Sequence, residues 1–348
     1  MKPYITMKLR TSAMRKIFLL SAIVISPLTY STPGPVLAQG MTTLTNESIE
    51  YQKLDSHYVI IKQAGISMIV VDNHPVDIRE LPGHQAGYNG VASLKHAGND
   101  SNLFVPAYAG LNFEHIHDGT ARNLIEKFEP RKFPMELRLI NSNTVEVYQP
   151  ATGNWQLESC GRYSLQKDGT IEYSFECIPR KLNYEKGYIG LFWASYINGP
   201  DNKGIHFLGR SRKTKQKIRW IDAISSQHGV NSTHEPFGNE RPLDVDKDFP
   251  LTLIGNQSTY EYTEPWFYGT RDSMVFLQVF RSADNIWFAQ SPSGGGNGNP
   301  AWDFQWFIDS PVLGKAYGFK MRAAYLPEQD RKQIEAIARK QLKLLSEN

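Results

Sequence analysis

The chain has 348 residues, of which 41% are hydrophobic and 12% aromatic, and this is enough to bury one large core or two ordinary ones. Its formal net charge of +3 is small for a chain of this length and does not indicate a nucleic-acid-binding surface. We therefore expect a globular protein that has no nucleic-acid partner.

The first 38 residues have the features of a secretory signal peptide. Arg15 and Lys16 precede a short apolar run at residues 17–25, and the segment ends in a small residue, Ala38. The run is too short to span a bilayer as a permanent helix. We expect residues 1–38 to be removed, leaving a periplasmic or extracellular protein with no membrane span. Because the leader holds five basic and no acidic residues, the mature chain has a formal charge of −2.

Alternating apolar and polar residues predict antiparallel strands along the mature chain. One hairpin joins residues 57–62 and 66–71, and another joins residues 135–140 and 144–148. Residues 73–103, between these hairpins, are rich in Gly, Pro, Asn and His, which is typical of a long functional loop. Further strands are predicted at residues 187–197, 205–209, 251–254, 274–280, 286–290, 301–308 and 317–325.

One substantial helix is expected, at residues 327–345, where apolar residues recur with helical spacing on one stripe. Many strands, frequent hairpin turns and a single terminal helix predict an all-β fold, a large antiparallel β-sandwich with one C-terminal helix. No linker-like segment interrupts the pattern, so we expect residues 39–348 to form one domain.

The two cysteines of the chain flank a predicted hairpin. Asp168-Gly169 is typical of a two-residue type I′ turn. In that register Cys160 lies opposite Cys177 in a non-hydrogen-bonded pair, where Cα atoms approach to about 4.5 Å. This spacing predicts a disulfide bond in an oxidising compartment, contributing at most roughly 3 kcal/mol. The alternative is a pair of free, buried thiols.

Residues 110–119 hold two imidazoles together with carboxylates, between glycines. If they form a strand, His115 and His117 point to one face, whereas Asn112 and Glu114 point to the other. Imidazole changes charge near neutral pH and is the commonest metal ligand. We expect the working site here, although two half-buried, hydrogen-bonded histidines remain an alternative interpretation.

A second candidate feature is the glycine- and asparagine-rich segment at residues 291–300, which runs into a predicted strand. That strand carries Trp302 and Trp306 on one face and Asp303 on the other. Indole rings beside a small-residue loop suit a sugar, because its apolar face packs on the rings. The alternative is the core face of a sandwich for at least one tryptophan. The expected substrate contacts are Asn112, Glu114, Trp193, Arg210, Asn299, Trp302 and Trp306.

Acid/base chemistry requires titratable groups near the substrate. The expected acid/base candidates are His115, His117, His234, Glu158 and Tyr196. If the ligand is an anionic polysaccharide, Arg210 or Arg212 from the basic run 210–219 would neutralise its carboxylate. The alternative interpretation is that the basic run is a solvent-exposed hairpin tip.

No cofactor is predicted, but metal binding by the His115/His117 pair is an alternative. Its third ligand would be His228, His234 or Glu158. Both thiols are expected in a disulfide, so thiol catalysis is not predicted.

Residues 310–325, where a loop precedes an alternating strand that ends in Tyr325, resemble the last strands of the galactose mutarotase-like β-supersandwich family. Residues 110–119 and 291–308 are also similar to a group of secreted bacterial proteins of undefined activity. The resemblance implies a concave sheet that binds carbohydrate, as in sugar epimerases, polysaccharide lyases and hydrolase-associated domains. It matches His115 to the histidine acid of mutarotases and places no carboxylate base. The family's paired central histidine motif is absent in recognisable form.

These features predict a secreted carbohydrate-binding or carbohydrate-processing protein that performs acid/base chemistry on a poly- or oligosaccharide. One alternative is a non-catalytic glycan-binding module that uses the same substrate contacts. A second alternative is a metal-dependent enzyme built on His115 and His117.

Overall fold

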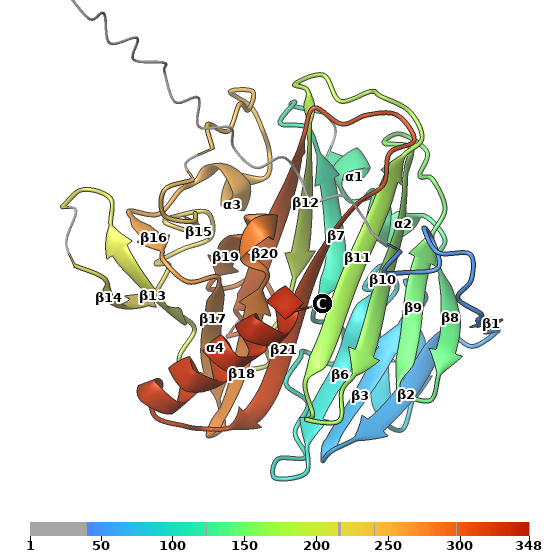
Figure 1. Ribbon diagram of the computed structural model, residues 1–348, viewed down its shortest axis with the longest axis horizontal. Helices are drawn as coiled ribbons and strands as arrows, with labels where there is room; N and C mark the ends of the chain where they lie inside the picture. Colours follow the sequence, from blue (N-terminus) through green and yellow to red (C-terminus); the bar gives the residue numbers. More distant parts are fainter. Residues whose placement is uncertain (1–39, 123, 215–216, 240, 297, 348) are drawn as a thin grey trace, which may run out of the picture. The chain divides into compact units, whose positions relative to one another are not determined.

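The computed structural model describes residues 40–122, 124–214, 217–239, 241–296 and 298–347 (Figure 1). The predicted signal peptide, residues 1–38, lies outside the described residues. The largest sheet has eleven strands. In spatial order they are β1 (Gln52–Lys53), β8 (Glu136–Asn141), β9 (Thr144–Gln149), β10 (Leu157–Leu165), β11 (Ile171–Pro179), β21 (Tyr317–Pro327), β18 (Met274–Phe280), β17 (Trp266–Arg271), β13 (Ile205–Ser211) and β14 (Arg219–Ala223), with β16 (Tyr260–Tyr262) paired to β13.

A second sheet has five antiparallel strands. In spatial order they are β15 (Thr233–His234), β19 (Trp287–Ser291), β20 (Ala301–Asp309), β12 (Tyr188–Ala194) and β7 (Asn112–His117). A three-stranded sheet contains β2 (Tyr58–Gln63), β3 (Ile66–Val71) and β6 (Gly90–His96), and a small hairpin joins β4 (Val76–Ile78) to β5 (Leu81–His84). The short helices are α1 (Leu124–Lys127), α2 (Glu129–Lys132), α3 (Thr252–Gly255) and the 3-10 turn η1 (Ser282–Asp284).

The main core lies between the five-stranded and the eleven-stranded sheets. Trp193 of β12 stacks on Phe304 of β20, with ring centroids 5.2 Å apart, and meets Phe319 of β21 edge-on at 5.0 Å. Because β21 belongs to the larger sheet, these rings join the two layers across the sandwich. The all-β sandwich expected from the alternating pattern is therefore confirmed.

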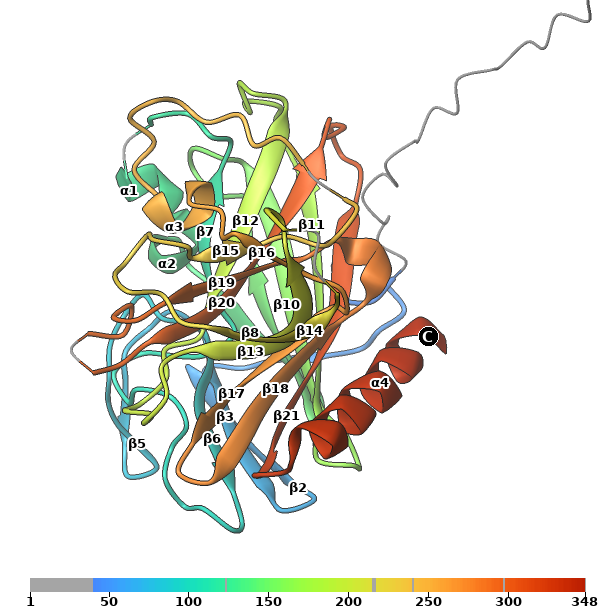
Figure 2. The ribbon, with the colours of Figure 1, turned by 90° about the vertical axis from the view of Figure 1, so that its left-hand side faces the viewer.

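The C-terminal helix is also confirmed, as α4 (Arg331–Glu347). Asp330 caps its first turn, because the Gln333 backbone N–H donates to Asp330 Oδ1 at 2.8 Å and the Asp330 N–H donates to Gln333 Oε1 at 3.1 Å. Its apolar stripe packs on β18 through Ile334 and Ala338. Figure 2 shows α4 lying against β18 and β21. No helix in the described ranges is long and apolar enough to cross a bilayer.

Two segments differ from the sequence expectation. Residues 251–254, predicted as a strand, contribute to the single turn of α3. Residues 73–103, predicted as a long loop, contain β4, β5 and β6. A run of four apolar residues such as 251–254 fits a strand or a helical turn, so periodicity alone does not separate the two. Within residues 73–103, β4 pairs with β5 and β6 pairs with β3, a pairing that local composition does not reveal.

The predicted disulfide is wrong, because Cys160 and Cys177 are both buried and unpaired. The β10–β11 hairpin pairs Cys160 with Glu176 and Ser159 with Cys177, one residue away from the expected register. Gly169 has φ +81° and its N–H donates to the Gln166 carbonyl at 2.9 Å, so the turn holds three residues rather than two. A slip of one residue puts two side chains on opposite faces of a sheet, so the sulfurs cannot meet.

Candidate functional site

A cavity of about 340 Å³ lies on the face of the five-stranded sheet that points away from the main core. β7, β12 and β20 form its floor, and α2, α3 and several loops complete the wall. Figure 2 shows α1, α2 and α3 on the same side of the molecule as β7 and β15. Its aromatic lining residues are Tyr88, Phe128, Phe192 and Tyr196, and its polar ones are Glu114, His115, Arg131, His228 and Asp303.

A β-bulge in β7 brings two neighbouring polar side chains into this cavity. His115 pairs with Phe192 and Phe113 pairs with Trp193, so Glu114 lies between them without a partner on β12. A bulge interrupts the regular alternation and re-aims a side chain. The expectation that Glu114 and His115 point to opposite faces is therefore wrong, and both line the cavity.

Glu114 is the most highly connected carboxyl of the cavity. Its Oε1 accepts hydrogen bonds from the Tyr196 hydroxyl at 2.5 Å and from Arg131 Nη1 at 2.9 Å, and its Oε2 lies 3.6 Å from His115 Nε2. Burial raises the pKa of Glu114, while the charge of Arg131 and these hydrogen bonds oppose the rise. The group is thus a buried carboxyl whose ionised form is supported from two sides.

Asp303 is the second carboxyl of the cavity, and its surroundings are different. The Ser195 backbone N–H donates to its Oδ1 at 2.9 Å, and the side chain is 1% exposed. Burial raises the pKa of Asp303 well above its usual range, and the charge of Glu114 adds to the rise. The cavity therefore contains two carboxyl groups of unequal acidity.

The two predicted imidazoles occupy different positions. His115 lines the cavity, and its ring contacts Phe128 and Phe192 with centroids 4.2 and 5.4 Å away. His117 is fully buried among Tyr188, Phe249 and Phe307. Within the described ranges, neither ring nitrogen of His117 has a hydrogen-bond partner. Of the pair, only His115 reaches the cavity.

The three tryptophans expected in a substrate wall lie on the other face of the sheet. Trp193, Trp302 and Trp306 are at most 2% exposed and belong to the main core. The predicted alternation of the β20 strand is nevertheless correct, because Asp303 reaches the cavity on the opposite face. Aromatic side chains line the cavity instead from loops and from β12, namely Tyr88, Phe128, Phe192 and Tyr196.

Several other predicted residues lie away from the cavity lining. His234 is 1% exposed, packs against Phe207 and has Gln290 Nε2 3.1 Å from its Nε2. Glu158 on β10 accepts hydrogen bonds from Tyr148 and Arg180. Arg210 on β13 pairs with Glu261 at 3.4 Å. Tyr196 is the exception among these candidates, because it lines the cavity and donates to Glu114.

The two asparagines that were expected to contact substrate have structural partners. Asn112 Oδ1 accepts from the Asn89 N–H at 3.1 Å, and the side chain is fully buried. Asn299 Oδ1 accepts from the Gly199 N–H at 2.9 Å, and its Nδ2 donates to the Gly295 carbonyl at 3.1 Å. Asn299 thereby orders the loop whose Gly294 lines the cavity.

Sequence reasoning did not identify Arg131 or Tyr88. The Arg131 guanidinium lies 4.0 Å from the centre of the Tyr88 ring and its Nε donates to the Gly87 carbonyl at 2.8 Å. Nothing in the sequence around α2 has a pattern that would point to a buried ion pair with β7. Asp303 could be found, because strand alternation separates it from its tryptophan neighbours.

For the metal-dependent alternative, His115 and His117 belong to no group of three clustered ligands among the described residues. Within the described residues, the group of His, Cys, Asp and Glu side chains that could share a metal ion is His57, Asp72 and His74. His228, one of the expected third ligands, lines the cavity and has its Nδ1 2.9 Å from Ser291 Oγ.

We expect the buried histidines to make the fold sensitive to acid. Burial lowers the pKa of His115 to about 3 and that of His234 to about 4, and it holds the pKa of His117 well below 6.5. As the pH falls below about 6.5, the unfolded chain binds protons that the folded chain excludes, so stability decreases towards pH 4. Each histidine contributes up to about 1.4 kcal/mol per pH unit. Urea unfolding at pH 7, 6 and 5 measures the slope.

His117→Phe is the matched variant for this prediction. It replaces an imidazole that lacks hydrogen-bond partners among the described residues with an apolar ring, so we expect a shallower slope. His96→Gln, at a partly exposed position of β6, should leave the slope unchanged. An equal slope in the His117→Phe variant and the unmodified protein would show that this imidazole does not carry the effect.

Comparisons with known proteins find similarity only in structure. No protein-family model matches the chain, and no curated protein matches its sequence. A protein from Escherichia coli K12, provisionally described as an aldose 1-epimerase, is similar with a TM-score of 0.45 and 7% identity over 78% of this chain and 99% of that one. An alpha-N-acetylgalactosaminidase from Bifidobacterium bifidum has a TM-score of 0.46 and 10% identity over 82% of this chain and 39% of its own.

A heparan sulfate lyase from Pedobacter heparinus is similar with a TM-score of 0.42 and 10% identity, over 81% of this chain and 37% of its own. The suspected distant resemblance to galactose mutarotase-like proteins fits this similarity, which is weak, with TM-scores of 0.41 to 0.45.

Proposed function

We propose that the protein processes a small carbohydrate in the cavity on the five-stranded sheet, by moving protons to and from the sugar. The observation that carries the proposal is the buried Glu114 carboxyl, held by Tyr196 and Arg131 in the wall of a cavity that also contains Asp303. Two carboxyl groups whose surroundings separate their acidities can divide the roles of base and acid.

Glu114 is the proposed base. Arg131 Nη1 lies 2.9 Å from its Oε1, and an opposite charge at this distance favours the ionised carboxylate. The Tyr196 hydroxyl supports the same form by donating to it. An ionised carboxylate in a cavity can accept a proton from a sugar hydroxyl within hydrogen-bond reach.

Asp303 is the proposed acid. Burial and the charge of Glu114 raise the pKa of Asp303 well above its usual range, which favours the protonated carboxyl that can donate a proton to a ring or glycosidic oxygen. His228, at the exposed end of the cavity, is close enough to Ser291 to be held in one orientation and could contact the outer part of the ligand.

The aromatic rings and carboxyl groups that line this small cavity support a carbohydrate as the ligand. The volume of about 340 Å³ is at the lower end of the range for ligand sites, which suits a mono- or disaccharide. Tyr88, Phe128 and Phe192 offer rings to the apolar face of a sugar, and the carboxyl groups accept hydrogen bonds from its hydroxyls.

We propose a neutral sugar rather than a uronate. Arg210 pairs with Glu261, and Arg212 donates to Glu235 at 2.6 Å, so both arginines already have carboxylate partners. Neither is among the described residues that line the cavity, and the arginine among these, Arg131, is paired with Glu114. We also propose that the protein is exported, on the basis of the signal-peptide pattern at residues 1–38.

Nuclear magnetic resonance tests the function directly. Saturation-transfer experiments on a panel of neutral mono- and disaccharides and matching uronates should detect binding of a neutral sugar. Exchange spectroscopy and product analysis on that sugar should then detect faster anomer interconversion or bond cleavage. A folded protein that binds no sugar in the panel at millimolar concentration, or binds only uronates, would contradict the proposal.

A further inference from the structure

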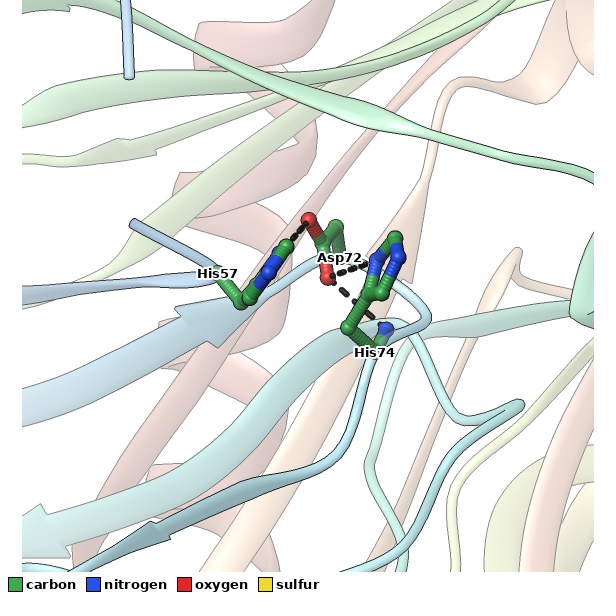
Figure 3. A group of neighbouring side chains, drawn as sticks. All are labelled: His57, Asp72 and His74. Carbon is green, nitrogen blue, oxygen red and sulfur yellow. Dashed lines mark hydrogen bonds and ion pairs between the residues drawn. The ribbon is translucent and has the colours of Figure 1, made fainter. Parts of the chain in front are cut away.

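We propose that His57, Asp72 and His74 form a binding site for a divalent transition-metal ion of the zinc class. This site is separate from the proposed function, because none of the three residues lines the cavity. Figure 3 shows the two imidazoles on either side of the Asp72 carboxylate. The nitrogen and oxygen atoms that each residue offers lie within 4.8 Å of one another.

The fold brings these residues together at the open end of one hairpin. Tyr58 of β2 pairs with Val71 of β3, so His57 and Asp72 are the next residues out on the two strands. The Asp72 backbone N–H donates to the His57 carbonyl at 3.3 Å. Asp72 Oδ1 then accepts from the His74 backbone N–H at 2.8 Å, which turns the chain and returns His74 to the carboxylate.

The distances match those between ligands of one metal ion. His57 Nδ1 lies 2.8 Å from Asp72 Oδ2, and His74 Nδ1 lies 3.3 Å from Asp72 Oδ1. Ligands bound at about 2.0–2.1 Å in tetrahedral geometry are about 3.3 Å apart. The rings stack with centroids 4.1 Å apart and planes 20° apart. The Nδ1 atom of each ring faces the carboxylate. Both imidazole side chains are about half exposed, so they have room to rotate and direct their Nδ1 atoms at one ion beside the carboxylate.

The burial pattern also suits a metal ion with an open position. Asp72 is 3% exposed, whereas the two imidazole side chains are about half exposed. Two imidazoles and a carboxylate are ligands that Zn²⁺ accepts, and water would complete its coordination. A bound ion would require each imidazole to present an unprotonated Nδ1, which a neutral ring does by carrying its proton on Nε2.

A bound ion would stiffen the segment that supports Arg131. Asn73, between the proposed ligands, donates through Nδ2 to the Phe133 carbonyl at 2.5 Å and to the Pro130 carbonyl at 3.3 Å. These carbonyls flank Arg131, which reaches Glu114. The site could therefore stabilise the wall of the cavity while taking no part in the proton transfers there.

Metal titration of the full protein, after chelator treatment and dialysis, tests the site. Isothermal titration with Zn²⁺ should show one equivalent, and Co²⁺ should give visible absorption bands of a protein-bound ion. His57→Ala and His74→Ala should each weaken Zn²⁺ binding by at least about 10-fold. His96→Ala, at a partly exposed histidine outside the cluster, should bind as the unmodified protein does.

Circular dichroism separates loss of ligands from loss of fold, and Asp72→Asn provides a second variant that keeps the shape of the side chain. Retained fold with lost Zn²⁺ binding supports the site. Absence of stoichiometric binding in the unmodified protein, or equal binding in the His57→Ala and His74→Ala variants, would overturn it. Sugar binding is measured separately, so failure of the metal site leaves the test of the proposed function unaffected.

Discussion

Glu114→Gln is expected to lower turnover of the carbohydrate substrate by about 100- to 10,000-fold, the usual contribution of a positioned acid or base. Glutamine keeps a carbonyl oxygen that can accept from Tyr196, but it cannot accept a proton from the sugar. We therefore expect the loss mainly in kcat, with sugar affinity changed much less. Steady-state kinetics and saturation-transfer binding measure the two quantities.

Glu158→Gln is the matched control for this experiment. It makes the same chemical change on β10, where Glu158 accepts from Tyr148 and Arg180 and does not line the cavity. We expect it to leave turnover within about two-fold, because the substituted group cannot reach the reacting atoms. Glu114→Gln leaves the buried Arg131 without its ion-pair partner, which could destabilise the fold. Thermal unfolding of both variants checks that they remain folded.

The Glu114→Gln variant also distinguishes an enzyme from a glycan-binding module. A module that only binds sugar would show no turnover in the unmodified protein and would lose affinity when Glu114 is substituted. If the unmodified protein turns over a sugar and the Glu114→Gln variant retains that turnover, Glu114 is not the base. Substitution of Asp303 would then be the next experiment.

Trp193→Ala is expected to lower the free energy of unfolding by about 3–5 kcal/mol, the usual effect of deleting a large aromatic side chain from a core. The indole is fully buried, and its Nε1–H donates to the Tyr173 hydroxyl at 3.0 Å. Its ring is stacked on Phe304 and Phe113 with centroids 5.2 and 5.0 Å away. Removal leaves a cavity between the two large sheets and takes one hydrogen-bond donor from the Tyr173 hydroxyl. Urea unfolding measures the change.

Trp220→Ala is the control, because this indole on β14 is only partly buried and packs on Trp266 at one edge of the sheet. We expect a clearly smaller loss there, since less apolar surface and fewer contacts are removed. If Trp193→Ala abolished sugar binding while leaving stability intact, the indole would be a ligand contact, as the sequence suggested, and not a core residue.

Local patterns in the sequence predicted most of the long elements of the fold, but not α3 or the strands within residues 73–103. The hairpin at residues 57–71 and the terminal helix follow from spacing alone, because side chains repeat every two residues in a strand and every 3.6 in a helix. The prediction of a disulfide was wrong because of a small difference in turn geometry. One extra residue in the turn at Gly169 shifts the register by one and puts the two thiols on opposite faces.

The candidate site was predictable only in part. The sequence by itself determined that β7 would carry titratable side chains, that Asp303 would lie opposite the tryptophans of its strand, and that the fold would be antiparallel. The tertiary structure alone decided that Glu114 would join His115 in the cavity and that Arg131 would reach it from α2. A bulge and a contact across the fold depend on pairing between distant segments, whereas periodicity describes only neighbouring residues.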